Sequence, residues 1–110
     1  MVKYVPEKGD IVWVDFEPQK GREISKKRPA LVLSPSNYNL KAELALFAPI
    51  TSSIKGYPFE VILEYDDING AILCDQIRSM DWKERKVTKI TTLEVKVIYQ
   101  VLYKIRLFLM

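Results

Sequence analysis

The sequence predicts a mainly β fold, a small and strongly bent barrel of six or seven short strands that ends in an α-helix. Three observations predict it. The chain has only 110 residues, short runs of β-branched and aromatic residues follow one another closely, and the last stretch changes to helical spacing. We expect residues 1–110 to form one domain, since a second domain has no room and 48% apolar content suffices for one small core.

The first two strands are predicted at residues 10–16 and 29–34. The run DIVWVDF at 10–16 is rich in β-branched and aromatic residues and carries apolar side chains on both faces, as expected of a strand wrapped into a barrel. Pro29 stands at the start of the second strand, where its missing N–H is tolerated. Residues 34–39, SPSNYN, are predicted to turn the chain.

Residues 43–50 and 58–64 predict the third and fourth strands. In the fourth strand Phe59, Val61 and Leu63 share one face, because side chains alternate along a strand. The opposite face carries two glutamates around one isoleucine and is therefore expected to be only partly wet.

The later strands follow a predicted hairpin. Asn69 and Gly70 suit the positive φ angles of a tight hairpin turn between the fourth and fifth strands. Residues 71–82 then predict one or two strands, and residues 85–90 predict the last. The glycines stand singly, which is typical of turn residues and excludes a glycine-rich phosphate loop.

The C-terminal segment is predicted to be a helix. Thr91 and Glu94 have the spacing of a capping box. The apolar residues that follow recur at helical spacing, among them Val101 and Ile105, and cover nearly the whole circumference. A helix with more than one apolar face is buried on more than one side, so we expect it to pack on the barrel and on a second copy of the chain in a homodimer.

One loop concentrates positive charge. Residues 20–28 carry five cations and one glutamate, a local charge of +4 that exceeds the +3 of the whole chain. This density favours an anionic partner, although charge alone also fits a solvated loop.

The residue inventory excludes several chemistries. The chain has no histidine and one cysteine, Cys74, so it has no Ser-His-Asp or Cys-His triad, no His-ligated zinc and no internal disulfide. We expect Cys74 to be a buried small residue, and we expect no metal and no cofactor. No uncharged apolar run approaches the length of a membrane span, so we expect a cytoplasmic protein without a membrane partner. RNA cleavage fits what remains, because the 2′-hydroxyl of RNA is its own nucleophile.

Three ordered motifs carry a family resemblance. GDIVWVDFEPQKGREISKKRPALVLSP (9–35), APITSSIKGYPFEVIL (48–63) and DQIRSMDW (75–82) resemble the MazF/PemK (Kid-like) toxin endoribonucleases, or mRNA interferases, of type II toxin–antitoxin systems. The resemblance implies an SH3-like barrel with short helices and a homodimer whose groove takes single-stranded RNA. It also implies sequence-specific cleavage without metal that leaves a 2′,3′-cyclic phosphate and a 5′-hydroxyl, inhibiting translation and growth.

The same resemblance implies the catalytic residues. Arg28, in KKRPA, matches the family arginine before the proline of the second strand and has a fork that can stabilise a phosphorane. Thr51 matches the threonine after the third strand, whose hydroxyl can orient the scissile phosphate, although it also suits turn capping. Glu23 matches an acidic loop residue and is the candidate general base or Arg28-orienting group.

The resemblance and the residue types together indicate a substrate-binding set. Cations are expected to neutralise RNA phosphates, Tyr57 to stack on a base, and two polar residues after Cys74 to touch bases. The set is Lys20, Lys27, Lys55, Tyr57, Asp75 and Gln76. Leu73 stands where some members carry an arginine, which leaves a catalytic part for Asp75 open.

The implied partners are single-stranded RNA and a cognate antitoxin whose acidic disordered tail folds across the basic groove, with DNA bound only indirectly through the antitoxin complex. Two alternatives stay open from the sequence. One is a non-enzymatic toxin that poisons gyrase, of the CcdB type, on the same fold. The other is a nucleic-acid-binding module that has lost catalysis.

Overall fold

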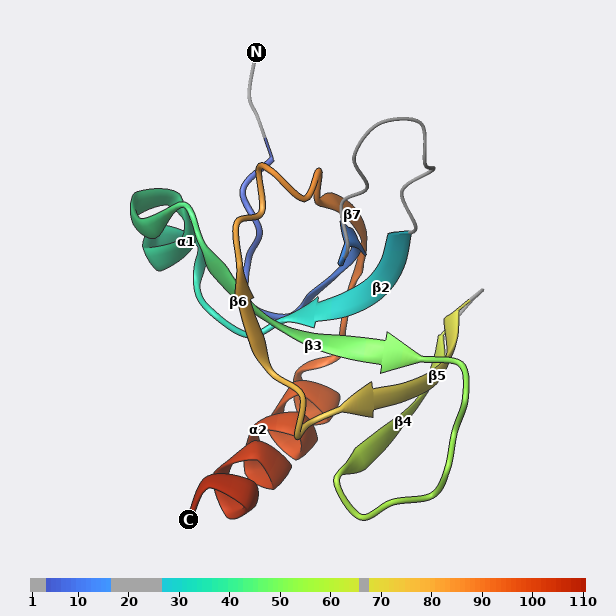
Figure 1. Cartoon of the computed structure of the whole chain (residues 1–110). Helices are drawn as coiled ribbons and strands as arrows, with labels where there is room; N and C mark the ends of the chain where they lie inside the picture. The colour runs from blue at the N-terminus through green and yellow to red at the C-terminus, as the bar shows by residue number, and fades with distance from the viewer. Residues whose placement is uncertain (1–3, 17–26, 66–67) are drawn as a thin grey trace.

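The computed structural model describes residues 4–16, 27–65 and 68–110 and confirms a mainly β fold with a C-terminal helix (Figure 1). The described part of the chain contains seven strands and two helices. In chain order they are β1 (Asp10–Asp15), β2 (Lys27–Val32), α1 (Ser36–Ala42), β3 (Ala45–Thr51), β4 (Glu60–Tyr65), β5 (Ile68–Leu73), β6 (Arg78–Met80), β7 (Thr88–Thr92) and α2 (Val95–Leu109).

All strand pairs are antiparallel, and the strands follow the order β4-β5-β3-β2-β1-β7, with β6 attached to β3. Strand β3 links the two parts of this curled sheet. Its first half pairs with β2 and β6, whereas its last residues, Ile50 and Thr51, pair with Ile72 and Ala71 of β5. Figure 1 shows β3 running through the middle of the molecule toward β5. The curl therefore places Thr51 where the two parts of the sheet meet.

The sheet has a core on each side because β1 and β2 alternate buried side chains between both faces. Ile11 and Leu31 pack with Ile50, Ile72 and Val101 of α2 in one cluster. The second cluster is formed by Val12, Val14, Phe16, Ala30, Val32, Ala45, Phe47, Met80 and Trp82. This arrangement confirms the prediction that the first strand carries core residues on both faces, and each fully buried aliphatic side chain contributes about 1.5–3 kcal/mol.

The hairpin turn predicted at Asn69–Gly70 is wrong. Both residues belong to β5, where they pair with Glu64 and Leu63, and the ladder continues to Tyr65 opposite Ile68. Long-range strand pairing thus outweighs the local turn preference of an Asn-Gly pair.

The turn predicted at residues 34–39 is also wrong, because α1 begins at Ser36. Buried Asn39 fixes this helix: its amide donates hydrogen bonds to the carbonyl oxygens of Pro6 at 2.7 Å and Ser34 at 2.9 Å. The Glu7 carboxylate accepts hydrogen bonds from the backbone N–H and hydroxyl of Ser36, which lower the Glu7 pKa. The contacts to Pro6 and Glu7 join segments about thirty residues apart in sequence, so local turn residues do not reveal them.

The capping box predicted at Thr91 and Glu94 is not formed. Thr91 lies in β7 opposite Ile11, and Glu94 is itself the N-cap of α2, without a side-chain cap hydrogen bond. The last strand therefore extends to Thr92, past the predicted limit of residue 90.

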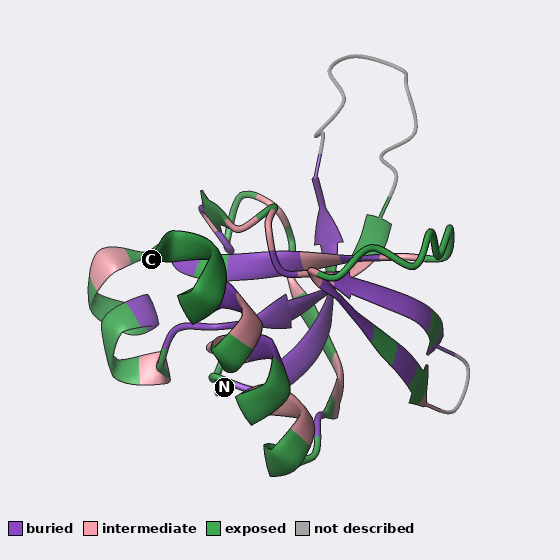
Figure 2. Ribbon diagram, turned by 90° about the horizontal axis from the view of Figure 1, so that it is seen from below, coloured by how far each residue is buried: buried purple, intermediate pink, exposed green. Residues whose placement is uncertain are grey.

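Helix α2 has the two apolar faces that its sequence predicts. Val101 and Ile105 are buried against the sheet. The outer face leaves large apolar side chains exposed: Val95, Tyr99, Tyr103, Leu107, Phe108 and Leu109. Figure 2, viewed from the side of α2, shows this outer face in green against purple strands. Within the described ranges no helix combines the length and apolar character needed to cross a membrane.

Candidate functional site

Two pockets meet at Thr51 and bring together most of the predicted site residues that the structure describes. The Arg28 pocket, of about 250 Å³, is lined by Trp13, Arg28, Pro29, Ile50, Thr51, Ser52, Ile68 and Asn69. The Lys55 pocket, of about 240 Å³, is lined by Thr51, Ser53, Lys55, Tyr57, Phe59, Glu60, Leu73 and Gln76. Because Thr51 lines both, a ligand extended across it can contact residues of both pockets.

Arg28 reaches this site from β2. The strand pairs Arg28 with Val14 of β1, and the pair between β2 and β3 nearest the site is Ala30 with Pro49. Arg28 and Thr51 each lie two residues beyond that pair, at the same end of the two strands. Arg28 is exposed, so its guanidinium is available to a phosphate.

Thr51 is the last residue of β3 and is half-buried. Its hydroxyl oxygen accepts a hydrogen bond from the Ser53 backbone N–H at 3.1 Å, so the turn-capping contact expected of this residue is present. The hydroxyl retains its proton as a donor. Turn capping and phosphate contact are therefore compatible, since one uses a lone pair and the other uses the O–H.

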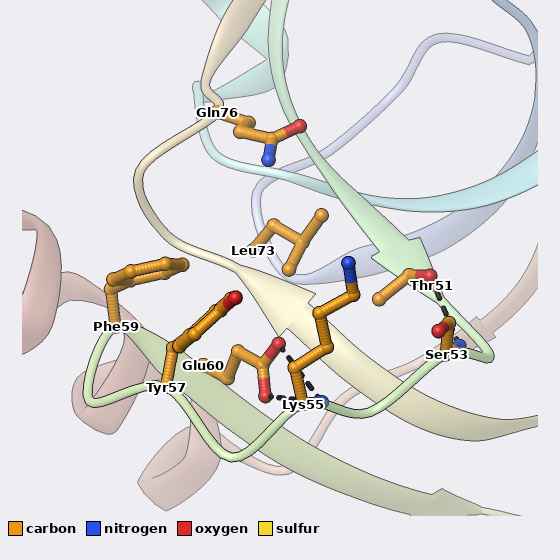
Figure 3. A pocket seen from close by; sticks show the side chains of 8 residues that line it. All are labelled: Thr51, Ser53, Lys55, Tyr57, Phe59, Glu60, Leu73 and Gln76. Atoms are coloured by element: carbon orange, nitrogen blue, oxygen red, sulfur yellow. Dashed lines mark hydrogen bonds between the residues drawn. The ribbon is translucent and has the colours of Figure 1, made fainter.

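Lys55, Tyr57 and Gln76 line the Lys55 pocket (Figure 3). In Figure 3 the Lys55 side chain extends into the space between Thr51 and Tyr57, and Gln76 lies across the pocket on the segment after β5. Tyr57 is half exposed, and its ring centroid lies 5.1 Å from that of Phe59 at an interplanar angle of 31°. A cation beside an aromatic pair of which Tyr57 is exposed is an arrangement that can hold a phosphate and a stacked base.

The loop that carries Lys55 and Tyr57 is fastened by Glu60, the first residue of β4. The Glu60 carboxylate is buried and accepts the backbone N–H of Gly56 at 2.9 Å and of Lys55 at 3.3 Å. From α2, the Lys104 ammonium donates to the carbonyl oxygens of Pro58 at 2.6 Å and Glu60 at 3.0 Å. The loop of residues 52–59 is thus tied both to the sheet and to the helix.

The remaining predicted residues lie apart from the two pockets or outside the described ranges. Lys27 is exposed at the start of β2 and lines neither pocket. Asp75 is half-buried in the turn after β5 and also lines neither; its Oδ1 is buried and accepts no hydrogen bond within the described part of the chain. Lys20 and Glu23 fall in residues 17–26, outside the described residues.

Several pocket residues were not predicted from the sequence. Trp13 is 40% exposed between buried Val12 and Val14, and the alternation of a strand was the signal that could have identified it as outward-facing. Asn69 was assigned to a turn, which concealed its place in the Arg28 pocket. Glu60 was placed on a partly wet face, and no local pattern marks it as a buried acceptor of loop N–H groups.

The structure agrees with the interpretation of Cys74 as a buried residue. It is fully buried and forms no disulfide, and burial raises the pKa of its thiol to about 11. A neutral buried thiol is a poor nucleophile. Within residues 4–16, 27–65 and 68–110, no group of three or more Cys, Asp or Glu side chains is arranged to hold a metal ion.

Solved structures of MazF, alone and in complex with MazE, have the same fold as this chain. MazF of Deinococcus radiodurans superposes with a TM-score of 0.86 at 42% sequence identity, over 97% of this chain and 98% of that chain. The MazE–MazF complex of the same organism gives a TM-score of 0.88 at 42% identity, over 97% of both chains.

Curated relatives agree with the structural comparison. The endoribonuclease toxin MazF of Escherichia coli K12 is 49% identical over 87 residues, 79% of this chain and 78% of the relative. The endoribonuclease toxin ChpB of the same strain is 34% identical over 106 residues, 91% and 90% of the two chains. Residues 7–109 match the model of the PemK-like, MazF-like toxins of type II toxin–antitoxin systems. The chain therefore belongs to this toxin family, and it is an endoribonuclease.

Proposed function

We propose that the protein is a sequence-specific, metal-independent toxin that cleaves single-stranded messenger RNA. The observation that carries the proposal is that Arg28 and Thr51, which come from different strands, line one pocket. An arginine and a hydroxyl at one site match the needs of RNA cleavage, in which charge grows on the phosphate and the attacking 2′-oxygen must be held in line.

The proposed reaction is a transesterification within the RNA. The 2′-oxygen forms a bond to the adjacent phosphorus, and the bond from phosphorus to the 5′-oxygen breaks. A base accepts the 2′-hydroxyl proton and an acid gives a proton to the leaving oxygen, so the products are a 2′,3′-cyclic phosphate and a 5′-hydroxyl. Arg28 stabilises charge on the non-bridging oxygens, Thr51 donates a hydrogen bond that orients the phosphate, and Glu23 is the proposed base or Arg28-orienting group.

RNA binding is assigned to the Lys55 pocket and its surroundings. Lys55 neutralises a flanking phosphate, Tyr57 stacks on a base, and Gln76 offers an amide to a base edge. Lys20, Lys27 and Asp75 complete the proposed binding set, as outer contacts beyond the two pockets. Because Leu73 gives the Lys55 pocket an uncharged wall, base choice is assigned to the shape of this pocket and to the Gln76 amide.

The proposed partners follow from charge and exposed apolar surface. The outer face of α2 is the proposed contact with a second copy in a homodimer, because it exposes Tyr99, Tyr103 and Leu107. A cognate antitoxin with an acidic disordered tail is the proposed inhibitor, supported by the Deinococcus complex of MazE with MazF. DNA is bound only indirectly, through that antitoxin. With messenger RNA as substrate, the toxin acts in the cytoplasm.

The test is cleavage of a long single-stranded RNA in EDTA by the wild-type chain and by Arg28→Ala. We expect site-specific cuts that end in a cyclic phosphate and a 5′-hydroxyl, and a loss of rate of about 10²–10³-fold in the variant, the scale of one lost charge-stabilising group. Lys41→Ala, which removes an exposed cation on α1 that lines neither pocket, is the matched control and should cleave normally. Full cleavage by Arg28→Ala would refute the site assignment, and dependence on added metal would refute the mechanism.

A further inference from the structure

We propose that Gly70 is a positioning residue for Thr51: its lack of a side chain lets the end of β3 lie directly against β5, at the junction of the two pockets. The inference rests on the proposed function, because it assigns Gly70 a part in the placement of a proposed catalytic hydroxyl. Gly70 itself lines neither pocket and contacts no RNA in this proposal.

The geometry at Gly70 leaves no space for a methyl group. A Cβ built there lies 3.0 Å from the carbonyl carbon of Thr51 and nearer still to the carbonyl oxygen, and 3.5 Å from Cγ2 of Ile50. The obstacle is backbone rather than the end of a flexible side chain, so it cannot rotate away. The next residue, Ala71, is the pairing partner of Thr51, which explains why the two chains are so close at this point.

The backbone conformation of Gly70 does not require glycine. Among the described glycines, the positive φ angles belong to Gly9 and Gly56. Gly70 lies in a regular antiparallel ladder opposite Leu63, a place where a glycine costs strand stability. Position 70 therefore requires a glycine because the backbone of Thr51 lies too close for a Cβ atom.

Displacement of Thr51 bears on the reaction because Arg28 is held by a different strand. Arg28 pairs with Val14 of β1 and lies two residues beyond the last pair between β2 and β3, so a methyl group at position 70 pushes Thr51 more than it moves Arg28. Carbon atoms in ordinary contact are about 3.5–4.0 Å apart, so the Thr51 carbonyl must shift by roughly 0.5–1 Å. A misplacement of about 1 Å in a catalytic group can cost about 10²-fold in rate.

The experiment compares Gly70→Ala with Gly9→Ala. Gly9 has a φ of 94°, and a Cβ there meets Cδ1 of Ile98 at 2.6 Å, so its alanine variant is strained against α2 and not against Thr51. Both variants are measured for thermal unfolding, for single-turnover cleavage of a short RNA, and for affinity toward the same RNA with a 2′-deoxy sugar at the cleavage site. We expect Gly70→Ala to lose about 10²-fold in single-turnover rate with little change in affinity, and Gly9→Ala to keep the wild-type rate.

A double-mutant cycle shows whether Gly70 acts through Thr51. In a Thr51→Ala background the hydroxyl to be placed is absent, so adding Gly70→Ala should change the residual rate little. The proposal is overturned if folded Gly70→Ala cleaves RNA at the wild-type rate, or if the two losses in the cycle are additive. It is also overturned if Gly70→Ala fails to fold where Gly9→Ala folds, because Gly70 would then be a general packing residue. An inactive wild-type chain would instead refute the proposed function.

Discussion

Replacing Glu60 by alanine should release the loop of residues 52–59 and weaken RNA binding. Glu60 is 6% exposed, and its carboxylate accepts the N–H of Gly56 at 2.9 Å and of Lys55 at 3.3 Å. A hydrogen bond to a charged group contributes about 1.5–3 kcal/mol, and only the shorter of these two has ideal length, so the closed loop should lose roughly 2 kcal/mol. The Lys104 contacts are made to backbone oxygens and persist in the variant.

A loss of this size changes the fraction of molecules with a closed loop. Since each 1.4 kcal/mol changes an equilibrium constant about tenfold, a loss of roughly 2 kcal/mol should raise KM by up to roughly 30-fold. The kcat should change less than KM, because Arg28 and Thr51 lie on strands β2 and β3 and only the Ser53 contact of Thr51 comes from this loop. Initial rates on a short RNA give the two constants, and hydrogen exchange of the Lys55 and Gly56 amides reports loop opening directly.

Two further variants make the result specific. Glu60→Gln keeps a side-chain oxygen that can accept the Gly56 N–H, and its KM should lie between those of the wild type and the alanine variant. Glu64→Ala removes an exposed carboxylate from the same strand and should change neither constant. A wild-type KM together with unchanged exchange at Gly56 in Glu60→Ala would show that the loop is held by other contacts, and the reasoning would fail.

Two other predictions concern the buried thiol and the outer face of α2. Cys74 should resist iodoacetamide in the native protein and react on unfolding. Its folded pKa of about 11 lies above the ordinary value near 9, so its contribution to the free energy of unfolding should be fully present below pH 9 and should be lost as the pH rises toward 11. Thermal melts across this pH range measure that loss. Wild-type chains should sediment as dimers, and Leu107→Glu, which places a charge on the exposed apolar face, should sediment as monomers; dimers that persist would exclude this face as the contact.

The part of the site that was predictable from the sequence consists of residues that stand in a recognisable motif next to the end of a predicted strand. Arg28 beside Pro29 and Thr51 at the end of an apolar strand were identified in this way, and the structure brings both into one pocket. Lys55, Tyr57 and Gln76 were also named, and they line the adjoining pocket. The parts played by Trp13, Asn69 and Glu60 were not identified, because each depends on which strand lies beside it and not on its own neighbours in sequence.

The fold class, the strand-rich pattern and the apolar C-terminal helix were determined by the sequence itself, since alternation and helical spacing are local properties of the chain. The absence of histidine likewise limits the chemistry of this chain, whatever fold it adopts. Tertiary structure alone decided that Asn69 and Gly70 extend a strand instead of turning, that Ser36 begins a helix, and that Thr91 pairs in β7. In each case a local preference worth a few tenths to about 1 kcal/mol was outweighed by ladder hydrogen bonds and burial supplied by distant segments.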